Sequence, residues 1–142
     1  MRSGGTATNA KELERRFQAL ATDVARFSSQ VVDIIVPEGN DRTWLADENL
    51  EIARTVFGKW CIEIFVLLYN FGPIGFEGLR RRLGVVSPRV LSRKLKMMED
   101  EGIVRRDLVD SRPPGVRYSL TEKGVTVVRI GTPVFLFLSF RK

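Results

Sequence analysis

The sequence lacks histidine altogether, and its 142 residues include a single cysteine, Cys61. An ordinary zinc site needs several cysteine or histidine ligands, so such a site is excluded. One cysteine cannot form an intramolecular disulfide, which suits a reducing compartment. Without histidine the usual nucleophile–base triads are impossible, and the sequence has no phosphate-binding glycine loop or metal-ligand cluster. We therefore expect neither an enzyme nor a bound cofactor.

Long apolar runs are also missing. The N-terminus is small and polar and has no apolar stretch of the kind found in secretory signals. The longest apolar run, "PVFLFLSF" near the C-terminus, is far shorter than the roughly 20 residues that a membrane span requires. These features predict a cytoplasmic protein without a membrane partner.

Positive charge exceeds negative charge, with 23 Lys and Arg residues against 17 Asp and Glu residues, a net charge of +6. The excess is uneven, because residues 1–73 carry 8 cations and 10 anions whereas residues 74–129 carry 13 and 7. A hydrophobic content of 44% is enough for one globular domain with a real core. The charge favours an anionic partner and places its binding surface in the second half of the chain.

The N-terminal part predicts a disordered start at residues 1–8 and then a long helix from Asn9 to about Val36, ended by Pro37. Its apolar residues recur at alternating spacings of four and three, which forms a heptad seam. The seam consists of Leu13, Phe17, Leu20, Val24, Phe27, Val31 and Ile34. A seam this narrow and long favours a partner helix, although packing against its own domain stays open. With its linker, this segment covers residues 9–43.

The next segment, residues 44–130, reads as several helices and a hairpin. Helices are predicted at 45–57, at the apolar stretch "KWCIEIFVLLYN" and at 76–83, with a short strand in "FGPIG". Two strand-like runs, "IVRRDLVD" and "VRYSL", are joined by "SRPPG", whose prolines and glycine suit a projecting loop. In the second run Arg117 and Ser119 are expected to face outward.

The stretch "SPRVLSRKLK" opens a helix expected over residues 87–101. Ser87 suits the N-cap, Pro88 suits the first helical position, and Gly102 suits the position just past the end. At about 100° per residue, one stripe holds Leu91, Leu95 and Met98. The opposite side carries Arg89, Arg93 and Lys96, flanked by Ser92. A solvated face is the ordinary interpretation of such a pattern, but its neighbours favour a binding surface.

The last part of the chain predicts two helices. Thr121 suits an N-cap, Gly131 interrupts the helix that follows, and Thr132 with Pro133 begins a short final helix. Residues 131–142 are therefore expected to form a separate apolar segment. Two of its aromatic residues, Phe135 and Phe137, are candidate dimer contacts.

Together these elements predict a mainly α fold with a small β-hairpin (α+β), a winged helix-turn-helix. The second helix of such a pair lies in the DNA major groove, and the first crosses the backbone. Arg89 and Arg93 could then reach base edges, and Lys96 would act as a point charge. Arg80 and Arg81 could contact phosphates, while Arg112 in wing 107–119 could enter a minor groove or touch the backbone.

Three motifs resemble HxlR-type winged-helix transcriptional regulators, relatives of the MarR group. They are "GKW" at 58–60, "SPRVLSRKLKMMEDEGIVRR" at 87–106 and "PPGVRYSLTEKG" at 113–124. The resemblance covers roughly residues 50–130 and implies a dimeric DNA-binding regulator. It places Ser87, Pro88, Arg89, Ser92 and Arg93 on the recognition helix, and Arg112 and Arg117 on the wing. The Cys-Pro pair typical of the family is missing, so thiol sensing is not transferred to Cys61.

We therefore expect a regulator that binds double-stranded DNA as a homodimer in the cytoplasm of a prokaryote, associated with the nucleoid. Its dimer would use the N-terminal seam and the C-terminal apolar segment. Two other interpretations stay open: a DNA-coating architectural protein of the same fold, and a protein-interaction module built on the heptad helix. An effector ligand, if one exists, is unknown from the sequence.

Overall fold

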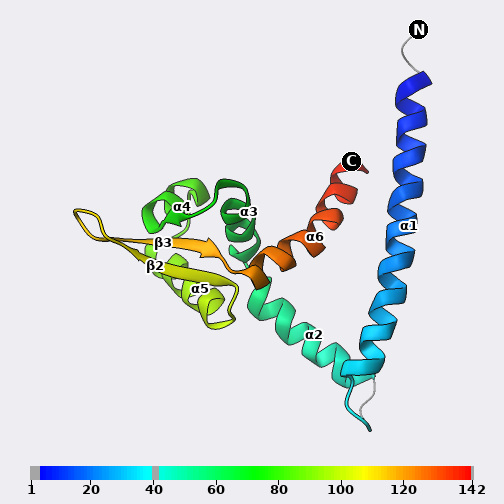
Figure 1. Ribbon diagram of the computed structural model, residues 1–142, viewed down its shortest axis with the longest axis horizontal. Helices are drawn as coiled ribbons and strands as arrows, with labels where there is room; N and C mark the ends of the chain where they lie inside the picture. Colours follow the sequence, from blue (N-terminus) through cyan, green and yellow to red (C-terminus); the bar gives the residue numbers. More distant parts are fainter. Residues whose placement is uncertain (1–3, 40–41, 142) are drawn as a thin grey trace. The chain divides into compact units, whose positions relative to one another are not determined.

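The computed structural model describes residues 4–39 and 42–141. The chain divides into two compact units, with the boundary between Asp47 and Glu48. Figure 1 labels the elements of both units along the chain. Each unit is described by itself below, and helix α2 (Arg42–Val56) crosses the boundary. Helix α2 begins at Arg42, three residues before the start of the helix predicted at 45–57.

The first unit is dominated by one long helix, α1 (Gly4–Ile35). It begins before Asn9, so the expected disorder is wrong for residues 4–8, while residues 1–3 lie outside the described residues. The amide of Val36 still bonds to the carbonyl of Val32, and the helix ends ahead of Pro37 because proline disfavours helical geometry in the residue before it. The seam side chains Leu20, Val24, Phe27 and Ile34 are exposed.

The second unit contains four further helices and a small sheet. In chain order they are α3 (Cys61–Phe71), β1 (Ile74–Gly75), α4 (Phe76–Leu83), α5 (Pro88–Asp100), β2 (Val104–Val109), β3 (Gly115–Leu120) and α6 (Glu122–Phe140). The three strands are antiparallel in the order β1-β3-β2, so β3 is the central strand. The β2–β3 hairpin extends past α4 and α5, and its loop forms the tip (Figure 1). This is the predicted winged helix-turn-helix.

The core of the second unit lies where α3, α4 and α5 meet the base of the hairpin. Its fully buried side chains are Cys61, Ile64, Leu79, Leu91, Leu95, Met98, Ile103 and Val104. Leu79 comes from the first helix of the predicted pair and Leu91 from the second, so the same core fixes both helices. Trp60, just before α3, adopts a left-handed backbone (φ 75°) and packs against this core.

Helix α6 is continuous, which corrects the expected interruption at Gly131 and the separate helix after it. Pro133 lies inside the helix, and Thr132 is not an N-cap, because its hydroxyl donates to the carbonyl of Val128 at 2.7 Å. Residues 131–140 of the predicted apolar segment therefore continue a longer helix, and residue 142 lies outside the described residues. In the described part of the chain, α6 is the one helix long and apolar enough to cross a membrane, a test of length and composition that core helices of globular proteins also meet.

A compact joint connects the end of α5 to the start of α6. Gly102 (φ 72°) ends α5, with its amide bonded to the carbonyl of Glu99 and that of Ile103 bonded to Met98, a Schellman arrangement. The hydroxyl of Thr121 donates to the carbonyl of Gly102 (2.6 Å) and accepts from the amide of Gly124 (3.1 Å). The ammonium group of Lys123 donates to the carbonyl of Glu101 (2.8 Å). Helix α5 is thus tied to α6.

Candidate nucleic-acid interface

The start of α5 is held by a cap on one side and an apolar anchor on the other. Ser87 Oγ accepts from the amide of Val90 at 3.2 Å, and Pro88 takes the first helical position, as the sequence predicted. Val86 precedes the cap and is buried, as is Leu91 in the first turn. Two apolar residues at these positions correspond to a hydrophobic staple, which fixes the angle at which the chain enters the helix.

The two faces of α5 divide as predicted. Leu91, Leu95 and Met98 are buried in the core of the second unit. The side chains on the other face are exposed: Ser87, Pro88, Arg89, Ser92, Arg93 and Lys96. The helix is therefore anchored by one apolar stripe and presents a cationic surface to a partner.

The cationic side chains of this face differ in whether they already form an ion pair. Lys96 Nζ lies 2.8 Å from Asp100 Oδ1 and 3.9 Å from Glu99 Oε1. The hydrogen bond to Asp100, followed by the charges of Asp100 and Glu99, raises the pKa of Lys96. Within residues 42–141, no ion pair or hydrogen bond is formed by the side chain of Arg89 or Arg93. These two guanidinium groups are the ones available to a ligand without breaking an existing pair.

The arginines of α4 also differ in whether they already contact another side chain. Arg80 donates through Nε (3.0 Å) and Nη2 (2.9 Å) to Glu77 Oε2. Arg82 stacks on the ring of Phe71, with 4.4 Å between its guanidinium carbon and the ring centroid. Arg81 is exposed, and no acidic partner for it occurs among the described side chains. Of the two residues predicted on this helix, Arg81 is thus the better placed for a phosphate.

The wing carries two exposed arginines, Arg112 in its loop and Arg117 on β3. Asp107 lies opposite Arg117 in the antiparallel register of β2 and β3. Its carboxylate accepts a hydrogen bond from Arg105 Nε at 2.9 Å. Within the loop, the hydroxyl of Ser111 donates to the carbonyl of Pro113 at 2.8 Å. The loop is therefore ordered by its own contacts and leaves Arg112 exposed.

Ser119 differs from its expected position. Its hydroxyl is buried and has no hydrogen-bond partner in the described part of the chain, although alternation along the strand placed it outward. Arg117 does face outward, as predicted.

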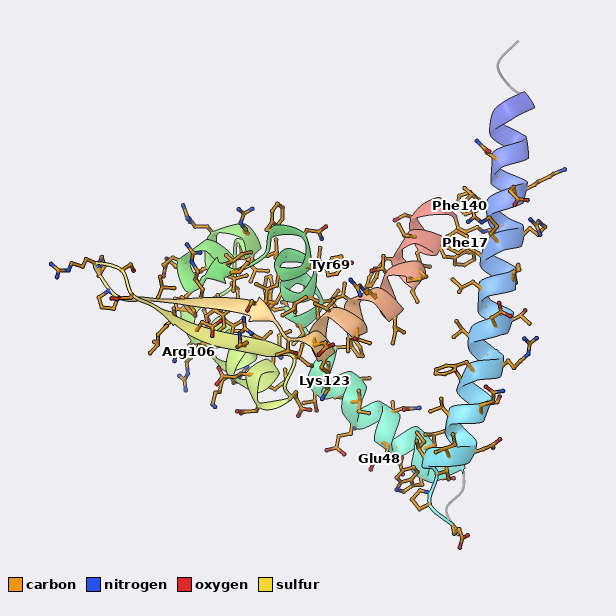
Figure 2. All side chains as sticks on the ribbon, viewed as in Figure 1. Phe17, Glu48, Tyr69, Arg106, Lys123 and Phe140 are labelled. Carbon is orange, nitrogen blue, oxygen red and sulfur yellow. The ribbon has the colours of Figure 1, made fainter. Side chains whose placement is uncertain are left out.

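The structure adds Arg106, which the sequence interpretation left out of the interface. Arg106 is exposed on β2, where Figure 2 labels it, and its charge slightly opposes the rise in the pKa of Lys96 that the acidic partners cause. Alternation from the buried Val104 puts Arg106 on the helix-facing side of the hairpin. The two-residue spacing between Val104 and Arg106 in the sequence could have predicted this position of Arg106.

The predicted dimer residues fall in both units. Leu13, Phe17, Leu20, Val24, Phe27 and Val31 lie on α1, whereas Phe135 and Phe137 lie on α6. On α6 the exposed apolar side chains are Ile130, Val134, Phe135, Leu136 and Leu138. Each unit therefore carries an apolar helical surface of its own.

Cys61 is fully buried at the start of α3. Burial raises the pKa of its thiol; the charge of Lys94 opposes this effect and that of Glu63 reinforces it. At neutral pH the group is a protonated thiol, which is a poor nucleophile. Across residues 4–39 and 42–141, no three His, Cys, Asp or Glu side chains are grouped to hold a metal ion.

Comparisons with known proteins agree with this geometry. An uncharacterized HTH-type transcriptional regulator from Halalkalibacterium halodurans is 41% identical over 73 residues, which are 51% of this chain and 65% of that relative. A crystal structure of a MarR-family transcriptional regulator from Enterococcus faecalis V583 matches with a TM-score of 0.60 and 27% identity, over 73% of this chain and 91% of that one. The redox regulator HypR in its oxidized form matches with a TM-score of 0.53 and 33% identity, over 64% and 90%.

The matched region thus spans slightly less than two thirds of the Halalkalibacterium halodurans relative. These relatives are named as transcriptional regulators, which is a non-enzymatic role. The family model described as "HxlR-like helix-turn-helix" matches residues 55–133, more than half of the chain, from the end of α2 into α6. The chain therefore belongs to the HxlR-like helix-turn-helix family of transcriptional regulators.

Proposed function

We propose that this regulator binds duplex DNA as a homodimer in the cytoplasm. In each protomer α5 enters the major groove, and the wing contacts the flanking DNA. Arg89 and Arg93 read base edges, and Lys96 acts on the backbone. Arg81 and Arg112 bind phosphates, while Arg80 supports the same surface from its pair with Glu77.

The observation that carries this proposal is the pair Arg89 and Arg93. The two residues lie one helical turn apart, on the face of α5 opposite its buried stripe. Neither side chain forms an ion pair with another described residue, whereas Lys96 already has Asp100. A guanidinium group can form two parallel hydrogen bonds to guanine O6 and N7 from a rigid planar fork, whereas lysine presents a point charge on a flexible stem. Two free guanidinium groups on an anchored helix suit base recognition.

The direct test is selection of binding sites from random duplex DNA with the full chain. We expect an enriched sequence with two similar half-sites, whose centres are about one helical turn apart or a multiple of that distance. Affinity for this duplex should exceed affinity for random DNA by about 10³-fold or more at one stated salt concentration. A ratio close to one would instead favour the architectural, DNA-coating alternative. Absence of any duplex binding would favour a protein-interaction module.

Dimerisation is expected to depend on the seam of α1. Full-length protein at micromolar concentration should sediment as a dimer, and deletion of residues 1–36 should give monomer or aggregate. Phe27, which is 64% exposed in the seam, offers a milder test. Phe27→Glu should dissociate the dimer, because a charge would have to be buried without a partner. DNA affinity should fall with the dimer, since two linked half-site contacts become one.

Ser29→Glu is the matched control for this prediction. Ser29 is exposed on the same helix but lies off the seam, so the same charge is added without entering the interface. The role given to α1 is wrong if full-length protein is monomeric, or if the truncated protein remains a dimer that binds DNA equally well.

Arg112→Ala should weaken DNA binding with little change in sequence preference, because the wing arginine is assigned to a phosphate. The plot of log affinity against log salt should become shallower by about one unit for each protomer bound. Arg112→Lys keeps the charge and should keep the slope. Titrations of both variants at several salt concentrations measure this difference. An unchanged slope for Arg112→Ala removes this residue from the phosphate contacts.

Redox control of the kind named for HypR is not part of this proposal, because Cys61 is buried and protonated. We expect the thiol of the folded protein to react with a thiol-specific reagent at least about a hundredfold more slowly than in denaturant, since reaction requires local opening. A disulfide reagent that releases an absorbing thiolate serves as the probe, and the rise in absorbance with time gives the reaction rate of the folded and of the denatured protein. Rapid stoichiometric labelling of the folded protein would contradict this prediction.

A further inference from the structure

The turn that joins the two helices of the helix-turn-helix exposes a valine. Val85 is 92% exposed, the highest value among the exposed large apolar residues in the described part of the chain. It follows Gly84, which ends α4 with a left-handed backbone (φ 83°), and precedes Val86, which is buried. Because Gly84 turns the chain and Val86 anchors it, the side chain between them extends into solvent.

The surroundings of Val85 distinguish it from the exposed apolar residues of α1 and α6. Those on α1 and α6 belong to long helical surfaces, whereas Val85 stands alone beside polar and cationic positions. Within four residues of it lie the exposed Ser87, Pro88 and Arg89 at the start of α5. Arg81 is exposed on the preceding helix. An isolated apolar group therefore lies in a surface that otherwise attracts polyanions.

The major groove of DNA offers one apolar feature, the C5 methyl group of thymine. The N-terminal residues of a recognition helix are the ones that reach base edges. Val85 lies two residues before the N-cap of α5, and almost none of its surface is covered by the rest of the protein. We propose that Val85 is a specificity-determining residue that contacts a thymine methyl group next to the bases read by Arg89. This inference rests on the proposed function.

The test uses the full chain and the duplex obtained by site selection. Each thymine is replaced in turn by deoxyuridine, which removes only the methyl group, and the dissociation constant is measured at one salt concentration. For the wild-type protein, one thymine in each half-site should give a loss of about fourfold, the size expected for returning one buried methyl group to water. Val85→Ala changes both protomers of the dimer, so on the thymine duplex it should lose this factor once in each half-site, about sixteenfold in all, and it should show no further loss on any deoxyuridine duplex.

Val66→Ala is the matched control. Val66 is an exposed valine on α3 in the same unit, so the chemical change is the same at a position outside the helix-turn-helix. This variant should retain the full sensitivity of the wild type to deoxyuridine. Thermal unfolding should be unchanged for Val85→Ala, because the fold does not use the side chain.

The outcomes separate this inference from the proposed function. If wild-type protein prefers the selected duplex but no thymine is sensitive, or if Val85→Ala keeps the wild-type sensitivity, the role of Val85 is wrong while DNA binding by α5 stands. If no duplex is preferred over random DNA, the proposed sequence-reading function fails first, and the inference fails with it.

Discussion

Gly124→Ala should lower the melting temperature of the protein by roughly 10 °C, corresponding to a loss of about 2 kcal/mol in the free energy of unfolding. A Cβ atom at residue 124 would overlap the carbonyl oxygen of Ile103 and lie 3.2 Å from Leu120 Cδ2. The first neighbour is main chain, so it cannot turn away as a flexible side chain would. The gain in helix propensity from alanine, up to about 1 kcal/mol, is too small to offset this clash.

The same helix provides the matched control for this prediction. Gly131 also lies in α6, but a Cβ atom built there meets nothing within 4 Å. Gly131→Ala should therefore stabilise the protein by about 0.5–1 kcal/mol, through the lower entropy of the unfolded chain and the better helix former. Thermal unfolding followed by circular dichroism measures both variants. Equal melting temperatures for the two variants would contradict the close contact between α6 and the end of α5.

The joint variant Arg89→Ala/Arg93→Ala should reduce affinity for the selected duplex by about 10²- to 10³-fold, and sequence preference should largely disappear. Each bidentate contact to a base contributes about 1–3 kcal/mol of discrimination, and adjacent contacts are not fully additive. Both side chains are exposed, so the fold should be unaffected. Fluorescence anisotropy with selected and random duplexes at a fixed salt concentration separates lost specificity from lost charge.

Two controls show which property of these arginines matters. Arg54→Ala/Arg129→Ala removes the same charge from exposed positions on α2 and α6, and it should lower affinity far less. Lys96→Ala should also have a smaller effect than either single arginine variant, because Lys96 is already engaged by Asp100. If Arg54→Ala/Arg129→Ala weakens binding as much as the α5 variant, general charge and not base contact governs affinity.

The helix-turn-helix could be predicted closely because its signals are local. Ser87 and Pro88 mark the start of α5 and Gly102 marks its end, and the structure has them in these roles. The buried stripe also followed from helical spacing alone, since Leu91, Leu95 and Met98 all meet the core. Local sequence signals and tertiary packing agree throughout this segment, and a structure can be predicted from sequence where they agree.

The predictions were wrong where local sequence signals and tertiary packing disagree. Gly131, Thr132 and Pro133 have the composition of a helix boundary, yet Val127 and Val128 pack against the core and the helix continues through Pro133. Alternation along β3 predicted an outward Ser119, but its hydroxyl is covered in the folded chain, which a two-residue pattern does not report. Lys96, predicted as a DNA contact, forms an ion pair in the structure that the sequence analysis did not consider. Asp100, four residues on, is a helical partner that the sequence already displayed.

The joint between α5 and α6 is chemically asymmetric. On the α6 side it uses particular residues, namely the hydroxyl of Thr121, the ammonium group of Lys123 and the missing side chain of Gly124. On the α5 side it uses main-chain carbonyls, which every amino acid provides, and one glycine at position 102. The exposed face of α5 can consequently diverge, or be exchanged by design, without any matching change in α6. A new DNA specificity could be grafted onto this scaffold as a single helical cassette ending in glycine.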